Sequence, residues 1–279
     1  MNKRTAFPLC WLMISMLAFL PLGCRPAATS AGKKLAVTNT TLESAAHDLL
    51  GDDVPILRLA EPGMCPGHFD LRPSQMTELR SCRAVLRFDF QKSLDARLRD
   101  ADTNRFGIME VSLRGGLCLP ENYLSACRQL AESFVAIGWL SRTEADAKLK
   151  QITERMAALG VRLKDQVAQA GLTGRPVLAS GHQKDFSEWL GLKVVASFRA
   201  ADTASVAEID QAIDAGQLAA VKLVVANLPE GRRTADALAE RLHAQVIVFG
   251  NFPALHNGRI SFDDLLAANV NALVAAKAR

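Results

Sequence analysis

The chain has 279 residues, with 33 lysines and arginines against 29 aspartates and glutamates, and a formal net charge of +4. Hydrophobic residues make up 49% and charged residues 22%, a globular composition that excludes bulk disorder and fibrous architectures. The length allows one to two domains. Because residues 1–23 carry Lys3 and Arg4 and no acid, the remainder is closer to neutral and has no basic run, so we expect no nucleic-acid partner.

Residues 1–23 have the pattern of a secretory signal peptide: a short positive segment, then an uncharged apolar stretch from Ala6 to Gly23. The segment from Leu20 to Cys24 resembles a bacterial lipobox, in which the cysteine is lipidated and begins the mature chain, although Pro21 departs from the usual aliphatic residue. The alternative is an uncleaved anchor, since this stretch can just span a bilayer. Either way we expect the rest, after a linker at 24–33, on the periplasmic or extracellular face, tethered to a membrane.

From residue 34 to about 140, short apolar runs alternate with amphipathic stretches. The pattern predicts strands over 35–38, 54–59, 84–88 and 108–113, and helices over 41–50, 73–80, 93–99 and from Pro120 onward. Proline is favoured at the first helical position, which supports the last of these. Strands that alternate with helices are typical of βαβ units, so we expect an N-terminal α/β lobe with a parallel sheet.

Residues 141–171 predict one long connecting helix. Ser141 and Glu144 match a capping box, in which each side chain satisfies an N–H group of the first turn. From there to Gly171 the sequence has no proline and one internal glycine, Gly160. A helix of about 30 residues is roughly 40–45 Å long, more than one small lobe requires. We therefore expect it to connect two lobes.

Residues 172–279 resume the alternation. Strands are predicted over 176–179, 192–198, 221–226 and 245–249, and helices over 184–190, 207–215, 234–243 and 262–277, with a further capping box at Ser205 and Glu208. The predicted fold class is therefore α/β, with two lobes, each a mostly parallel sheet with flanking helices, joined by a long rigid α-helix. Ligands of such sheets bind beyond the carboxyl ends of the strands, which places the candidate site in a cleft between the lobes.

The loop over 61–75 carries the most informative pattern. Cys65 and His68 follow a predicted strand and precede a predicted helix, on a segment that two glycines and several prolines make stiff. A stiff loop suits metal binding because its ligands need little ordering. A thiolate and an imidazole at this spacing can share one ion, but two ligands alone do not make a zinc site.

This segment resembles a loop of the metal-binding solute-binding proteins of ABC importers, which are zinc- and manganese-binding lipoproteins. The run from His68 to Ser74 is similar to the family loop that supplies the first metal ligand. The segment 119–122 resembles the family turn that opens the helix before the long one, and 178–192 resembles the second-lobe loop that carries a histidine. The resemblance covers the mature chain and implies two α/β lobes on a rigid helix, a metal-binding function without catalysis, and an ABC permease and its ATPase as partners.

The departures from the family pattern prevent a direct transfer of its ligand set. Where the family has a second histidine, this chain has Gly115-Gly116-Leu117-Cys118. His182 lies about two places from the family position, and Phe249-Gly250-Asn251 replaces a late aspartate.

A four-ligand set can still be composed from Cys65, His68, Cys118 and His182. Thiolate and imidazole ligands favour Zn²⁺, or alternatively Cu⁺, over Mn²⁺, which prefers oxygen. We expect a monomer that binds one such ion between its lobes.

Several alternatives remain at this stage. Outside the cytoplasm the cysteines of the folded part can pair instead of binding metal, for example Cys65 with Cys118. Cys127 fits buried packing, or a disulfide with Cys82. His256, in a segment expected to be a flexible loop, is a further candidate ligand.

Two other functions compete with metal capture. One is an adhesin or structural lipoprotein that keeps the fold without binding metal. The other is a thiol-redox protein that uses Cys65, which lacks a resolving cysteine nearby. A serine hydrolase is disfavoured because the Gly-x-Ser-x-Gly motif is absent, and we expect no enzyme activity.

Overall fold

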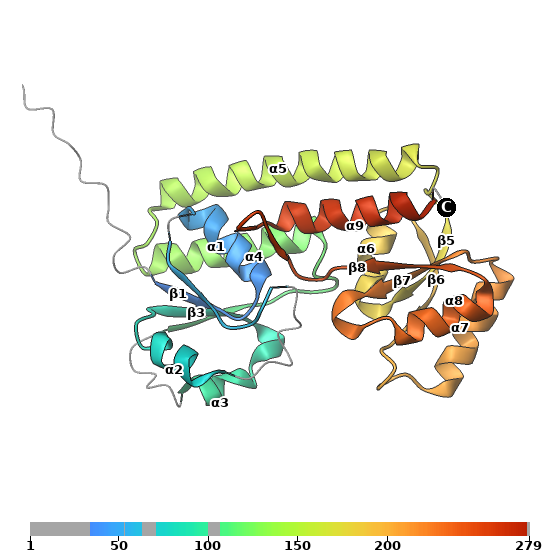
Figure 1. The fold of residues 1–279 in the computed structure, drawn as a ribbon. Helices are drawn as coiled ribbons and strands as arrows, with labels where there is room; N and C mark the ends of the chain where they lie inside the picture. Colours follow the sequence, from blue (N-terminus) through green and yellow to red (C-terminus); the bar gives the residue numbers. More distant parts are fainter. Residues whose placement is uncertain (1–33, 53, 63–70, 100–106, 278–279) are drawn as a thin grey trace, which may run out of the picture.

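A computed structural model describes residues 34–52, 54–62, 71–99 and 107–277. Two α/β lobes lie side by side, and one long helix spans both of them (Figure 1). The predicted signal peptide, the lipidation site Cys24 and the linker lie outside the described residues. Within these ranges, no helix is both long and apolar enough to cross a bilayer.

The first lobe contains a four-stranded parallel sheet in the order β2-β1-β3-β4. One face packs against α1 and α4 and the other against α2 and α3, because successive residues of a strand point to opposite faces. In β1, for example, Leu35 and Val37 contribute to the first of these cores and Ala36 to the second. The elements are β1 (Leu35–Val37), α1 (Thr40–Leu50), β2 (Ile56–Arg58), α2 (Pro73–Leu79), β3 (Ala84–Phe88), the 3₁₀ helix η1 (Asp89–Gln91), α3 (Leu94–Arg99), β4 (Gly107–Val111) and α4 (Pro120–Ala136).

The second lobe repeats this arrangement in the order β6-β5-β7-β8, again with parallel strands. Helices α7 and α8 cover its outer face, and α6 and α9 cover the face that continues into the first lobe. Its elements are β5 (Pro176–Ser180), the 3₁₀ helix η2 (Gly181–Gln183), α6 (Lys184–Trp189), β6 (Lys193–Phe198), α7 (Val206–Leu218), β7 (Leu223–Asn227), the 3₁₀ helix η3 (Leu228–Glu230), α8 (Arg233–Leu242), β8 (Gln245–Phe249) and α9 (Phe262–Lys277).

The segment after β8 differs from the sequence-based expectation of a loop. It forms a small antiparallel hairpin, β9 (Leu255–His256) and β10 (Arg259–Ile260). Asn257 and Gly258 connect the strands with φ angles of 48° and 77°. Asn-Gly tolerates two successive positive φ values, which the tight turn of a two-residue hairpin requires. The Asn-Gly dipeptide is a sequence signal for a hairpin. The flanking strands have only two residues each, too few to produce a recognisable strand pattern.

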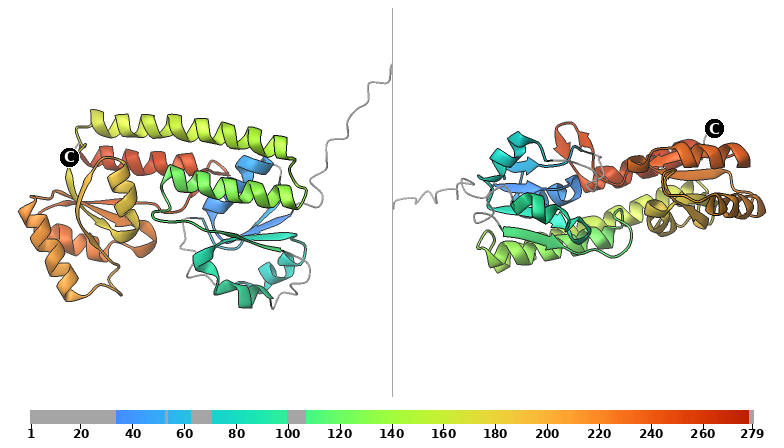
Figure 2. Two further views of the ribbon diagram at one scale, coloured as in Figure 1. Left: turned by 180° about the vertical axis from the view of Figure 1, so that it is seen from behind. Right: turned by 90° about the horizontal axis from the view of Figure 1, so that it is seen from below.

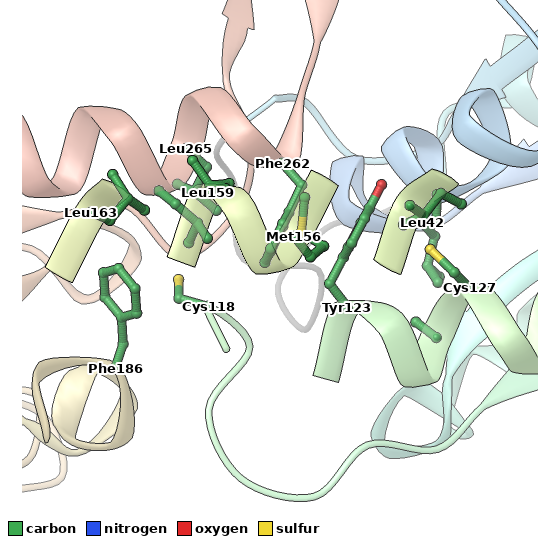
Figure 3. Packing of buried hydrophobic residues seen from close by; sticks show 14 of the residues in the cluster. Leu42, Cys118, Tyr123, Cys127, Met156, Leu159, Leu163, Phe186, Phe262 and Leu265 are labelled. Carbon is green, nitrogen blue, oxygen red and sulfur yellow. The ribbon is translucent and has the colours of Figure 1, made fainter. Parts of the chain in front are cut away.

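The long connecting helix is confirmed as α5 (Arg142–Gln169), with Ser141 and Glu144 forming the predicted capping box. Helix α9 runs alongside it and returns toward the first lobe (Figures 1 and 2). There the ring of Phe262 stacks on Tyr123 of α4, with centroids 4.1 Å apart and planes 3° from parallel (Figure 3). Buried residues of both lobes form one continuous hydrophobic cluster through α5 and α9. The lobes therefore share a core.

A polar network beside this core ties four helices together. Asp48 of α1 accepts a hydrogen bond from the Tyr123 hydroxyl at 2.6 Å and pairs with both terminal nitrogens of Arg155 on α5, one of them at 2.9 Å. The Arg155 Nε atom lies 3.2 Å from Oδ2 of Asp263 on α9. Burial, aided by the neighbouring Asp48 and Asp264 charges and opposed by Arg155, raises the pKa of Asp263 above its ordinary value. Asp48 thus has hydrogen-bond partners for both of its oxygens, whereas the fold disfavours the ionised form of Asp263.

We predict opposite consequences for two matched substitutions in this network. Asp48→Asn should lower the free energy of unfolding by about 2–3 kcal/mol, because it weakens hydrogen bonds to a charged partner and a buried hydroxyl. Asp263→Asn should leave stability at pH 7 unchanged or slightly higher, because it removes a carboxylate whose ionised form the fold disfavours. Since the folded state binds the Asp263 proton more tightly than the unfolded chain does, the advantage of Asp263→Asn should grow as pH rises through the raised pKa. Urea unfolding of both variants measures this, and equal losses would contradict it.

Candidate functional site

The segments that follow β4 in the first lobe and β5 and β8 in the second contact one another, beyond the carboxyl ends of these strands. We call this contact region, over residues 112–119, 181–185 and 250–251, the seam. From the first lobe, the segment between β4 and α4 reaches the second: the Gly116 N–H donates to Oδ2 of Asp185 on α6 at 2.7 Å. Cβ atoms placed on Gly115 and Gly116 would lie 2.9 and 3.1 Å from the nearest Asp185 atoms, so the backbone can approach this closely only without side chains. Gly115 and Gly116 therefore let the two lobes come into direct contact here.

Gly250, directly after β8, is the centre of this seam. Its carbonyl accepts hydrogen bonds from Cys118 Sγ at 3.4 Å, Gln183 Nε2 at 3.2 Å and Asn269 Nδ2 at 2.9 Å, and its N–H donates to Asn269 Oδ1 at 2.7 Å. A Cβ on Gly250 would lie 2.9 Å from Leu265 Cδ1, so a side chain here would displace α9 contacts. Cys118 of the first lobe and the turn over 181–183 of the second therefore meet at one oxygen.

Cys118 lies at the bottom of the seam with an exposed fraction of 0%. Its sulfur points among apolar side chains, with Phe186 on one side and Leu159 and Leu163 of α5 on another (Figure 3), and it also contacts Asn251 Oδ1 at 3.5 Å. Burial raises the pKa of its thiol to about 12, so the neutral form is stabilised. The thiol is free, which argues against the alternative disulfide with Cys65.

His182 lies at the outer rim of the same edge. It belongs to η2, directly after β5, and its side chain is 65% exposed. Its Nε2 atom is 3.3 Å from Oε1 of Glu230 in η3, and Oε2 of that carboxylate accepts a hydrogen bond of 2.5 Å from the Ser180 hydroxyl. Sequence reasoning missed Glu230, because it lies about 50 residues from His182 and only the parallel pairing of β5 with β7 brings the two together.

Cys65 and His68 lie in the segment 63–70, outside the described residues. The elements that flank this segment, β2 and α2, form where they were predicted. In the described part of the chain, no group of three or more His, Cys, Asp or Glu residues comes together in a way that could hold a metal ion. The predicted set of Cys65, His68, Cys118 and His182 remains a prediction.

Amide side chains occupy the point in each sheet where the strand order reverses. In the first lobe, Oε1 of Gln91 accepts a hydrogen bond from the Thr38 hydroxyl at 2.7 Å. In the second, Nε2 of Gln183 donates to Oδ1 of Asn227 at 3.0 Å, while Oε1 of Gln183 has no hydrogen-bond partner although the residue is fully buried. These buried glutamines thus occupy the place where open parallel sheets usually bind ligands.

The remaining cysteines have structural roles. The alternative disulfide between Cys82 and Cys127 is wrong: both are free, and they lie in cores on opposite faces of the first sheet. Burial raises the pKa of Cys82 to about 11 and that of Cys127 further still. The packing role expected for Cys127 on α4 is confirmed. His256 is exposed on β9.

No protein-family model matches the sequence, and no curated protein matches it. Solved structures do match the fold. A crystal structure of ZnuA superimposes with a TM-score of 0.72 and 14% identity, over 88% of this chain and 99% of that one. A ZnuA deletion mutant with zinc bound gives a TM-score of 0.70 and 15% identity, over 88% and 98%. A Mn-bound periplasmic metal-binding protein from Candidatus Liberibacter asiaticus gives a TM-score of 0.71 and 14% identity, over 88% of this chain and 99% of that one. These likenesses confirm the predicted two-lobed fold.

We predict that the three described cysteines are unreactive in the folded protein. A mature chain with Cys24→Ser and Cys65→Ser keeps only Cys82, Cys118 and Cys127. At pH 8 their raised pKa values and burial should slow reaction with a disulfide reagent at least about a hundredfold relative to an exposed thiol, since the thiolate is the reacting form. The control is Val206→Cys in the same background, at a position that is 79% exposed. Three thiols should react after unfolding in guanidinium, and a fast native thiol in the background chain would contradict the prediction.

Proposed function

We propose that this protein is an extracytoplasmic solute-binding protein that captures a transition-metal ion, zinc as the first candidate, for an ABC importer. The observation that carries the proposal is the meeting of Cys118 and the turn over 181–183 at the Gly250 carbonyl. Cys118 of the first lobe and Gln183, the neighbour of His182 in the second, thus contact the same carbonyl oxygen. The likeness of the fold to ZnuA supports the same conclusion.

The proposed ligands are Cys65, His68, Cys118 and His182. The segment that holds the first two leaves the sheet after β2, and Leu59 is still hydrogen-bonded to the Val37 carbonyl at the end of β1. Because carboxyl ends of parallel strands lie at one edge of a sheet, this segment starts on the edge that faces the seam.

The ligand types restrict the ion. Cys118 is stabilised as a neutral thiol by burial, so a bound cation must displace its proton. Zn²⁺ and Cu⁺ do this readily with sulfur ligands, whereas Mn²⁺ favours oxygen. The solved structures that share the fold include zinc-bound, Mn-bound and Cd-bound forms, by their own descriptions.

The rest of the proposal concerns delivery. A lipid on Cys24 would hold the protein at the membrane surface, where a permease and its ATPase take up the ion. The protein itself would act as a monomer and catalyse no reaction.

A second candidate is a lipoprotein of the same fold that binds no metal and serves adhesion or structure. It is favoured by the direct bonds across the seam, such as that of Gly116 to Asp185, which close the lobes without an ion. The side chains at the buried strand ends, such as Gln183 and Asn227, are amides rather than imidazoles, which also favours a protein that binds no metal.

Metal uptake by the reduced, chelator-free mature protein distinguishes the two candidates. We expect one Zn²⁺ per chain and, at a free Zn²⁺ concentration of a hundred times Kd, a stabilisation of about 2.7 kcal/mol, measured as a rise in Tm. His68→Ala should weaken binding most, with His182→Ala and Cys118→Ala next. His256→Ala is the control, and its affinity should match the wild type because its hairpin lies against α1, where Arg259 pairs with Asp52.

If neither zinc nor copper binds and Tm does not move, the importer proposal is wrong and the second candidate takes its place. Insulin reduction by the wild type that is lost in Cys65→Ser would instead favour the thiol-redox alternative. A loss of affinity in His256→Ala would place that residue in the ligand set.

A further inference from the structure

Glu230 and His182 form a contact that neither the family pattern nor the predicted ligand set contains. The 3₁₀ helices η2 and η3 follow β5 and β7, which are hydrogen-bonded neighbours, so the two turns lie next to each other. Oε1 of Glu230 is 3.3 Å from His182 Nε2, and its Oε2 accepts the Ser180 hydroxyl hydrogen bond at 2.5 Å. A hydroxyl, a carboxylate and an imidazole therefore follow one another from the sheet outward.

Burial decreases along this series. Ser180 is 1% exposed, the Glu230 side chain 21% and the His182 side chain 65%. Ser180 is fixed in β5, so its hydroxyl can hold one oxygen of the carboxylate in place and aim the other at the imidazole. An imidazole that is mostly exposed has few packing contacts to order it, which leaves Glu230 as the group that determines its orientation.

The other carboxylates near this turn do not take that role. Asp185 directs Oδ2 at the Gly116 N–H across the seam. Glu188, at the next turn of α6, is exposed. Lys184, which follows the turn, is also exposed and can only repel a cation.

We propose that Glu230 positions His182 for metal binding through Nδ1, an inference that rests on the proposed function. A neutral imidazole has one N–H donor and one lone pair. If Nε2 carries the proton and donates it to Glu230, the lone pair is on Nδ1, which becomes the ligand atom. Carboxylates hydrogen-bonded to ligand histidines fix the ring and increase its basicity, and their loss typically weakens metal binding 10- to 100-fold. Glu230 is a positioning residue and Ser180 supports it.

The first test compares Zn²⁺ affinity in full-length mature variants. Glu230→Ala should raise Kd by about 10- to 100-fold. Glu230→Gln, which keeps an oxygen acceptor, should recover part of that loss, and Ser180→Ala should show a smaller loss. The control Glu188→Ala also removes one negative charge, but from α6, and should bind Zn²⁺ with the affinity of the wild type. Circular dichroism and Tm of the metal-free variants establish that each is folded.

The second test identifies the ligand atom. In protein labelled with ¹⁵N-histidine and loaded with ¹¹³Cd²⁺, the His182 coupling to cadmium should appear at Nδ1. Coupling at Nε2 overturns the inference, as does a Glu230→Ala affinity equal to that of the wild type. Both outcomes leave the proposed function intact, whereas a wild type that binds no Zn²⁺ overturns the proposed function itself.

Discussion

One hydrophobic core runs through both lobes, and the positions of Cys118 and His182 depend on it. Helix α5 spans 28 residues, a length of about 42 Å at 1.5 Å per residue. It buries residues from Ala145 at the first lobe to Val167 at the second, and α9 returns beside it so that Phe262 stacks on Tyr123. Because these contacts are buried and apolar, they fix one sheet relative to the other without any ligand. The position of the strand ends relative to one another is thus a consequence of how α5 and α9 pack.

The seam itself is held by polar contacts of a different kind. Gly250 offers both of its backbone groups to Asn269, and its carbonyl also receives Cys118 and Gln183. A Cβ on Gly250 would lie 2.9 Å from Leu265 Cδ1, so glycine lets α9 pack this closely against the turn. The same property of glycine at 115 and 116 lets Asp185 approach the backbone of the first lobe. Glycines and amides thus bring the two lobes into direct contact.

Much of the fold was accessible from the sequence, and the reasons are physical. Strand and helix periods, the capping boxes at Ser141 and Ser205 and the missing helix breakers up to Gly171 are local signals, and the corresponding elements formed as predicted. The candidate site was less accessible because it is assembled by pairing between distant strands. Glu230 becomes a neighbour of His182 only through the register of β5 with β7, and the hydrogen bond of Cys118 to Gly250 joins residues 132 apart in the chain. The depth of each residue also depends on the fold: Cys118 and His182 both follow a strand in a glycine-containing segment, yet Cys118 is fully buried and His182 is exposed.

This difference in depth bears on how the proposed capture of metal would proceed. An ion arriving from solvent would meet His182 first, at the rim, and Cys118 last. To ligate, Cys118 must give up its contacts with Gly250 and Asn251 and lose its proton. A thiol is a weak donor, so the contacts are worth at most about 1 kcal/mol each, whereas apparent binding energies of zinc in thiolate and imidazole sites reach about 10–16 kcal/mol. The loss of these two contacts would therefore cost far less than the formation of such a site provides. The shared core holds the lobes together whether or not an ion is bound. Binding of an ion would therefore move side chains at this edge rather than produce a hinge motion of the whole molecule.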